Sequence, residues 1–357
     1  MKYLARFAAA TLIAAACDDA MPPTETGSIR PEFGMSIGAT CVIDLGTLGG
    51  TFSEATSINE RGQVVGQSSL PSGELRAFVW TEQGGMIDLG TLGGERSSAS
   101  GINDLGEVVG TSSIVPGGAN RAFLWTERQG MVSLGALASG ASEAAGVNNL
   151  GEVVGISHIS GVTFHAFRWT EREGMTDLGT LGGNFSWGLA VNNRGEVVGR
   201  SAVTTGEEHA FRWTEREGMV DLGTLGGALS FAFAINDGGQ VAGSSPLASG
   251  GTRAFLWTKQ DGMTDLGTLG IPFSRAFGIN DRGEVVGQAI VSLVGFRAFL
   301  WTERNGMTNL GALEGTTGLG SQASDINNRG ESVGFSSTAS GDIHAVLFTM
   351  RSCSSSL

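Results

Sequence analysis

Aspartates recur along the sequence at a spacing that could supply carboxylates for acid–base or metal chemistry. They sit in the phrase DLGTLGG and its variants, whose equivalent positions are Asp44, Asp88, Ser133, Asp177, Asp221, Asp265 and Asn309. Each position belongs to a separate copy of a longer repeated unit, so no two are expected to meet in one site. We therefore predict that these carboxylates accept hydrogen bonds from amides of the Gly-rich phrase.

The remaining polar positions do not form a catalytic pattern either. His165, His209 and His344 alternate with Arg at one position of the unit, which indicates hydrogen bonding or packing. The Asn-Asp turns lack the dense spacing of carboxylates found in calcium loops. No G-x-S-x-G, H-E-x-x-H or C-x-x-C motif is present. We predict no catalytic residues, no metal and no cofactor.

Three consecutive units carry side chains suited to binding. Trp187, Phe231 and Arg275 occupy one equivalent position, which the other units fill with Glu54, Ser98, Glu143 and Gln322. An aromatic pair beside a guanidinium could stack a sugar ring or hold an anionic ligand. His158, in the segment ISHISGVTF, is the histidine outside the repeated pattern and is a further candidate. The alternative is that these residues pack neighbouring units together.

The positions above are set by a sevenfold repeat. The pattern (I/V)-N-x-x-G-x-x-x-G has its asparagines 44, 45, 44, 44, 44 and 47 residues apart, at Asn59, Asn103, Asn148, Asn192, Asn236, Asn280 and Asn327. A second phrase, (R/H)-A-F-x-W, also occurs seven times, the last copy being the degenerate HAVLF. The units cover residues 41–353 and leave a short tail at 354–357. Repeats of 40–45 residues are typical of propeller blades.

Each unit contains four short strand signals: a small-residue run, a β-branched run, an alternating aromatic run and a GMxDLG run. Turns rich in Asn, Asp and Gly separate them, and no helical period occurs. The sequence therefore predicts an all-β fold, a seven-bladed β-propeller of four-stranded blades.

The repeat region begins with a segment equivalent to a fourth strand, and no first, second or third strand of the same unit precedes it. CVIDLG, at 41–46, stands alone, whereas the last unit has three strands, at 321–327, 331–337 and 344–350, and no fourth. We predict that the N-terminal strand completes the last blade and closes the ring. Cys41 and Cys353 both match the turn between third and fourth strands, so we predict a disulfide between them.

The phrases HAFRWTEREGM, TDLGTLGG and VNNRGEVVG resemble the HAF repeat, a bacterial repeat family. The blade layout is also similar to that of WD and kelch propellers. The HAF resemblance covers nearly the whole repeat region and implies an extracellular location. It implies no activity.

The N-terminus points to the same location. MKYLARFAAATLIAAAC, residues 1–17, has basic residues, a short apolar stretch and small residues before Cys17, as a secretory signal does. The end resembles a lipobox, which implies lipidation of Cys17, although Ala14 replaces the usual Leu and plain cleavage is the alternative. Residues 18–40 read as a flexible linker. We expect an extracytoplasmic protein that touches a membrane only through a lipid anchor.

Charge and loop variation indicate the kind of function. The formal charge of −13 argues against nucleic-acid binding. Insertions at 111–120 and 312–321 fall on one rim of the ring, which we take as the ligand face. We predict a secreted or surface-anchored, monomeric, non-catalytic binding module for a carbohydrate or a protein. The alternative is an extracellular propeller enzyme acting on polysaccharide, a lyase or hydrolase. The four His and single Tyr disfavour that alternative.

Overall fold

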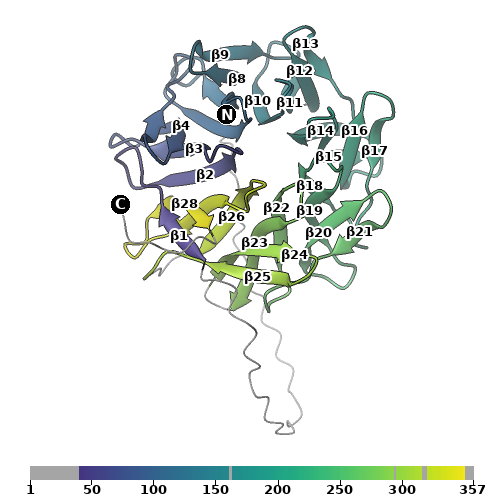
Figure 1. The fold of residues 1–357 in the computed structure, drawn as a ribbon. Coiled ribbons are helices and arrows are strands. Elements are labelled where there is room, and N and C mark those ends of the chain that lie inside the picture. The colour runs from purple at the N-terminus through teal and green to yellow at the C-terminus, as the bar shows by residue number, and fades with distance from the viewer. Residues whose placement is uncertain (1–39, 161–162, 293–294, 316–319, 350–357) are drawn as a thin grey trace. The chain divides into compact units, whose positions relative to one another are not determined.

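The repeated runs form seven four-stranded antiparallel sheets arranged as the blades of a ring, which confirms the predicted β-propeller (Figure 1). The computed structural model describes residues 40–160, 163–292, 295–315 and 320–349. Within each blade the first strand lies nearest the ring axis, and the first strands of neighbouring blades contact one another all the way round.

The strands of blades 1 to 3 are β2 (Ser53–Ile58), β3 (Val64–Ser69), β4 (Leu75–Thr81), β5 (Gly85–Asp88), β6 (Ser97–Ile102), β7 (Val108–Ser113), β8 (Asn120–Thr126), β9 (Gly130–Gly135), β10 (Ser142–Val147), β11 (Val153–Ser160), β12 (Thr163–Thr170) and β13 (Gly174–Asp177). Those of blades 4 to 6 are β14 (Gly182–Val191), β15 (Val197–Val203), β16 (Glu208–Thr214), β17 (Gly218–Asp221), β18 (Phe231–Ile235), β19 (Val241–Pro246), β20 (Thr252–Thr258), β21 (Gly262–Asp265), β22 (Ser274–Ile279), β23 (Val285–Ser292), β24 (Gly295–Thr302) and β25 (Gly306–Gly311). Blade 7 holds β26 (Ser321–Ile326), β27 (Ser332–Ser337), β28 (Ile343–Thr349) and β1 (Cys41–Asp44).

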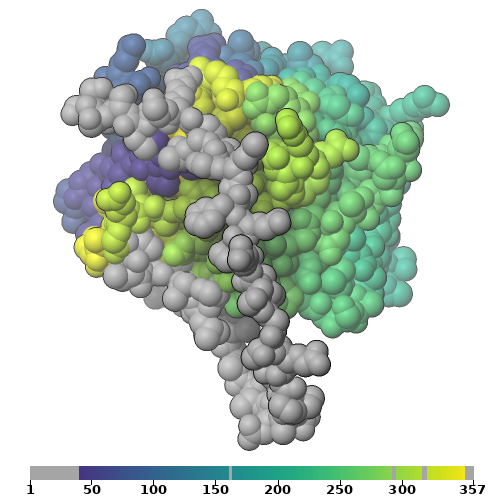
Figure 2. Space-filling model, turned by 60° about the horizontal axis from the view of Figure 1, so that its bottom comes forward, coloured from purple at the N-terminus to yellow at the C-terminus, as the bar shows by residue number. Residues whose placement is uncertain are grey.

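The ring closes as the sequence predicts. Strand β1 pairs antiparallel with β28, and Cys41 lies opposite Thr349 in the register. Figures 1 and 2 show the purple N-terminal residues directly beside the yellow C-terminal ones. The side-chain pair His344–Asp44, with 2.7 Å between Nδ1 and Oδ2, joins the same two strands. The two ends of the repeat region therefore share one blade.

The hydrophobic core lies between the blades. The alanine and phenylalanine of each (R/H)-A-F phrase are fully buried, and they pack against valines and isoleucines of the adjoining blade, as Phe123 packs against Val65. The six tryptophans of the pattern are only partly buried and pack against the edges of these clusters. Removing a buried Phe of this kind would cost about 3–5 kcal/mol, so the phenylalanines rather than the tryptophans anchor the blades.

The connections between strands define two rims. The loop rim carries the loops from second to third strands and those between blades, which meet through bonds such as Gly50 N to Ser69 O, 3.0 Å. The turn rim carries the Asn-containing turns and the turns between third and fourth strands. Gly62 and Gly85 occupy these turns with φ of 77° and 65°, which only glycine adopts readily.

A closed belt of hydrogen bonds runs round the turn rim. One asparagine per blade donates from Nδ2 to the main-chain oxygen of its equivalent in the next blade, over 2.9–3.2 Å: Asn59, Asn103, Asn148, Asn192, Asn236, Asn280, Asn327 and back to Asn59. These side chains are buried, so each satisfies a carbonyl that water would not reach. The repeated Asn is therefore a structural residue.

No helix in the part of the chain that the structure describes could cross a membrane.

Candidate functional site

The loop-rim ends of β14, β15 and β18 bring two aromatic rings and one guanidinium together. Trp187 lies directly opposite Arg200 in the β14–β15 register. The Arg200 guanidinium lies over the Trp187 ring, 4.0 Å from its centroid, and also reaches Phe231 of the next blade at 5.3 Å. Trp187 and Phe231 are half-buried. The stack therefore joins blades 4 and 5 and still exposes ring surface to solvent.

A carboxylate completes this group. Glu208, at the start of β16, holds its Oε2 3.0 Å from Nη1 of Arg200 and forms an ion pair with it. That oxygen is buried and has no hydrogen-bond partner. Burial lowers the pKa of Arg200, and the charge of Glu208 opposes the change. The charges of the two side chains balance, and the Arg200 guanidinium is the described partner of this oxygen.

Arg275 stands apart from this stack. It lies near the start of β22 in blade 6, where its guanidinium packs 5.2 Å from the Phe273 ring centroid. Its Nε is buried without a hydrogen-bond partner. Burial lowers the pKa of the guanidinium, and nothing raises it. The predicted trio is therefore split, because Arg200 rather than Arg275 supplies the guanidinium between Trp187 and Phe231.

His158 does not join either group by any described contact. Its ring packs edge-on against Phe164 of the neighbouring strand, with centroids 3.9 Å apart. The sequence reasoning missed Arg200 and Glu208. A signal was available for Arg200, because the second-strand position opposite Trp187 holds Gln67, Thr111, Ile156, Ser244, Gln288 and Phe335 in the other blades.

Aromatic residues outside the repeated pattern gather in the same part of the ring. Of the ten among the described residues, eight lie in blades 3 to 6: Phe164, Phe185, Trp187, Phe231, Phe233, Phe273, Phe277 and Phe296. Phe233 and Phe277 touch across blades 5 and 6, with centroids 5.3 Å apart, and Phe273 and Phe296 touch within blade 6, with centroids 5.5 Å apart. Blades 1, 2 and 7 lack this concentration, so a binding surface is best placed on blades 4 to 6.

Two carboxyl groups occupy the equivalent position in other blades, one in blade 1 and one in blade 3, which adjoins blade 4. Glu54 in β2 and Glu143 in β10 are half-buried, and desolvation raises the pKa of each carboxyl group. The amide of Gln67 donates to Glu54 over 3.4 Å and partly offsets the effect. Strand β6 of blade 2 stands between the two strands. The raised pKa favours the protonated form of each group, but the two do not face a common substrate position by any described contact.

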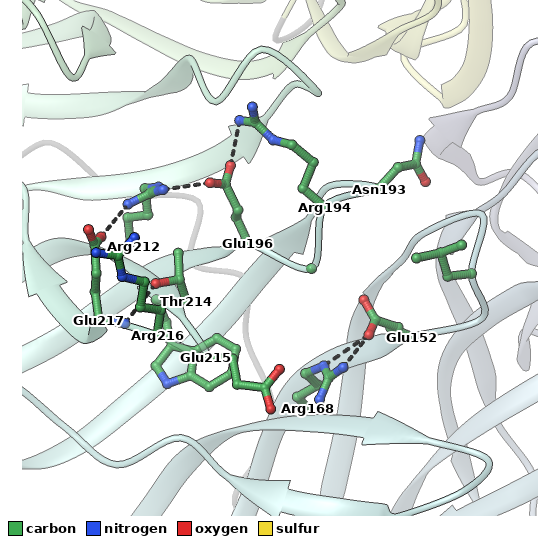
Figure 3. A pocket seen from close by; sticks show the side chains of 13 residues that line it. Glu152, Arg168, Asn193, Arg194, Glu196, Arg212, Thr214, Glu215, Arg216 and Glu217 are labelled. Atoms are coloured by element: carbon green, nitrogen blue, oxygen red, sulfur yellow. Dashed lines mark hydrogen bonds and ion pairs between the residues drawn. The ribbon is translucent and has the colours of Figure 1, made fainter.

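A hollow of about 520 Å³ lies on the turn rim between blades 3 and 4 (Figure 3). Arg168 and Arg212 line it at a position that holds Val or Leu in the other five blades. Arg168 is ion-paired with Glu152, and Arg212 with Glu196. Burial opposes ionisation of Glu196, but hydrogen bonds from Arg212, Asn192 and Arg194 outweigh it and lower its pKa. The charges that line this hollow are largely satisfied by one another.

The aspartate and histidine rows have the structural role predicted. Asp88 Oδ1 accepts a hydrogen bond from Gly90 N over 2.8 Å. Each of the other aspartates of the row likewise accepts one from the main-chain N of the glycine two residues later. His165 and His209 each pair with the Asp opposite, at 2.8 and 2.7 Å. No cluster of three metal-ligating side chains occurs among the described residues. Cys17 and Cys353 lie outside the residues described, so lipidation and the disulfide stay predictions.

Comparison with known proteins agrees with the fold. No protein-family model and no curated protein matches the chain. Among solved structures it is similar to the acylaminoacyl peptidase of Pyrococcus horikoshii (TM-score 0.52, 10% identity, 84% of this chain and 52% of that one) and to puromycin hydrolase (0.51, 14%, 85% and 53%). TolB from Acinetobacter baumannii scores 0.49 at 10% identity, over 84% of this chain and 65% of that one. The chain thus spans between half and two thirds of these proteins, and the likeness shows the propeller fold alone.

Proposed function

We propose that the protein is an extracytoplasmic, non-catalytic binding module of the HAF-repeat type, and that its ligand is a carbohydrate held on the loop rim of blades 4 and 5. One observation carries this proposal: the stack of Trp187, Arg200 and Phe231 with the carboxylate of Glu208 ion-paired beside it. Sugar rings present apolar faces and hydroxyl groups. A half-buried indole suits the first, and a carboxylate beside a guanidinium suits the second.

Charge supports a carbohydrate over a polyanion. Removal of residues 1–17 with Lys2 and Arg6 would take the formal charge from −13 to −15, because two positive charges leave. A chain of that charge repels densely anionic partners. The balanced pair of Arg200 and Glu208 adds no net charge to the site.

The test is a glycan-array screen with residues 18–357, followed by calorimetry on any sugar that binds. Trp187→Ala and Glu208→Ala should each weaken binding by about 10-fold or more, since each removes a stacking or hydrogen-bonding partner worth about 1–2 kcal/mol. Phe335→Ala, which removes an aromatic ring from blade 7, is the control and should leave affinity unchanged. Binding of a protein and no sugar would point to the other ligand class. Equal affinities for wild type and both variants would show that the stack only packs the blades.

The location and anchoring have their own test. Expression of the full chain in a bacterium, with cell fractionation and mass analysis of the N-terminus, should place the protein outside the cytoplasm with a lipid on Cys17. A free N-terminus after cleavage would favour plain secretion. Light scattering should show a monomer.

The enzyme alternative rests on the raised pKa values of Glu54 and Glu143. A polysaccharide hydrolase would need two carboxyl groups on either side of one bond. A reducing-end assay on any glycan that binds, repeated with Glu54→Gln and Glu143→Gln, decides between the two. Release of new ends by wild type and its loss in either variant would overturn the non-catalytic assignment.

A further inference from the structure

The guanidinium of Arg275 is a half-buried cation without a counter-charge among the described residues. It makes no hydrogen bond or ion pair with any residue that the structure describes, and its buried Nε is unpartnered. The pKa of the group is lowered by burial alone, with no neighbouring acid to raise it. By contrast, Arg200 has Glu208 beside it.

The residues around Arg275 explain why nothing neutralises it. The side chain opposite it on β23 is Gln288. The equivalent positions of the neighbouring blades hold Phe231 and Gln322. Its one described ring contact is with Phe273. Stacking on an aromatic face orients the guanidinium plane but does not satisfy its donors, so the fork remains free to bind an oxyanion.

We propose that Arg275 binds a carboxylate carried by the sugar ligand, so that the ligand class is an acidic carbohydrate such as a uronate-containing oligosaccharide. This inference rests on the proposed function and specifies its ligand. The partial burial of this unpaired charge is unfavourable, and an anionic group that binds it lessens that penalty. The planar guanidinium fork matches a carboxylate in a bidentate arrangement.

The placement fits a ligand that reaches from one group to the other. Trp187, Phe231 and Arg275 are equivalent residues of three successive inner strands, β14, β18 and β22, and each of these strands contacts the next. A ring stacked at blades 4 and 5 therefore has the cationic position of blade 6 further along the same rim. Because the chain as a whole is acidic, sparse carboxylates are favoured over a densely sulfated chain.

The experiment compares a glucuronate-containing oligosaccharide with its carboxyl-reduced counterpart, which keeps the skeleton and loses the charge. Calorimetry on the mature chain should show the acidic form binding about 10- to 100-fold tighter, the range of a charge-assisted bidentate contact. Arg275→Gln should bring the acidic form down to the affinity of the reduced one and leave the reduced form unchanged. Arg275→Lys should retain part of the preference, and added salt should shrink it.

The matched control is Arg282→Gln, which makes the same charge change in the same blade but on the turn rim, where Arg282 is paired with Glu284 at 2.6 Å. It should leave both affinities unchanged. If wild type binds the two forms equally, or if Arg275→Gln weakens both alike, this inference is wrong and the proposed function stands. If wild type binds neither form, this inference is wrong, and the proposed function is decided by the glycan array. A sulfated analogue bound tighter than the uronate would overturn the carboxylate assignment.

Discussion

Asp325 is a carboxylate at the seam between the last blade and the first. It lies in β26 at a position that the other blades fill with Ser, Gly or Ala. Its Oδ2 accepts from Ser57 Oγ at 2.8 Å and from Ile58 N at 3.0 Å, both in blade 1. Burial raises the pKa to about 6, against 3.8 for an ordinary Asp; the hydrogen bonds partly oppose this, and Glu60 adds to it.

A raised pKa makes this group stabilising when protonated. The folded chain holds the proton up to about pH 6, whereas the unfolded chain releases it near pH 4, so the contribution of Asp325 falls as pH rises between these values. Two pKa units correspond to about 3 kcal/mol, of which about 2 kcal/mol is lost between pH 4 and pH 7. Asp325 keeps some solvent-accessible surface, which favours the smaller of these two free energies.

The test is Asp325→Asn, which keeps an acceptor for Ser57 and Ile58 and removes the charge. Urea unfolding followed by tryptophan fluorescence should show the variant gaining about 2 kcal/mol relative to wild type from pH 4 to pH 7. The difference between the two chains cancels the titration of all other groups. A difference that is flat across this range, or that moves in favour of wild type as pH rises, would refute the reasoning.

Three further predictions concern closure and the belt. Deleting residues 41–46 removes β1, so the shortened chain should aggregate or be cleaved faster by protease; an unchanged melting temperature and a monomer would contradict the closure seen in the structure. Cys41 and Cys353 should be joined in protein exported to an oxidising compartment, and free thiols at both positions in non-reduced mass spectra would exclude the bond. Asn148→Ala should lower the unfolding free energy by about 2–4 kcal/mol, measured by urea unfolding, because it strips buried partners, including the carbonyl of Asn192, of their hydrogen bonds.

The sequence was sufficient to predict the fold because the period, the four strand signals and the unmatched strand at 41–46 are all local patterns. Seven blades and the pairing of β1 with β28 are confirmed. The site was predicted only in part. Repeat alignment places Trp187 and Arg275 at equivalent positions, but partnership depends on cross-strand register, which brings Arg200 rather than Arg275 to Trp187.

Two properties, the isolation of Arg275 and the raised pKa of Asp325, could not be predicted from the repeat pattern, for a related reason. Arg275 has no counter-charge because the neighbouring strands supply none. An alignment of the repeated units shows which residues are equivalent but does not show which charges lie near a given side chain. The unusual acidity of Asp325 follows from enclosure between two blades that are 268 residues apart in the chain at the Ser57 contact. Both depend on packing in three dimensions around a single side chain.

The pairing of β1 with β28 at the seam also determines when a growing chain can complete its fold. Asp44 emerges first from the ribosome, yet its partner His344 follows 300 residues later. Until then Val42 lacks the residues of blades 6 and 7 that it packs against, and Ile43 and Leu45 lack those of blade 7. Nascent protein would thus carry uncovered apolar surface throughout translation, the condition in which chaperones are needed. The strand made first is the last to find its neighbour.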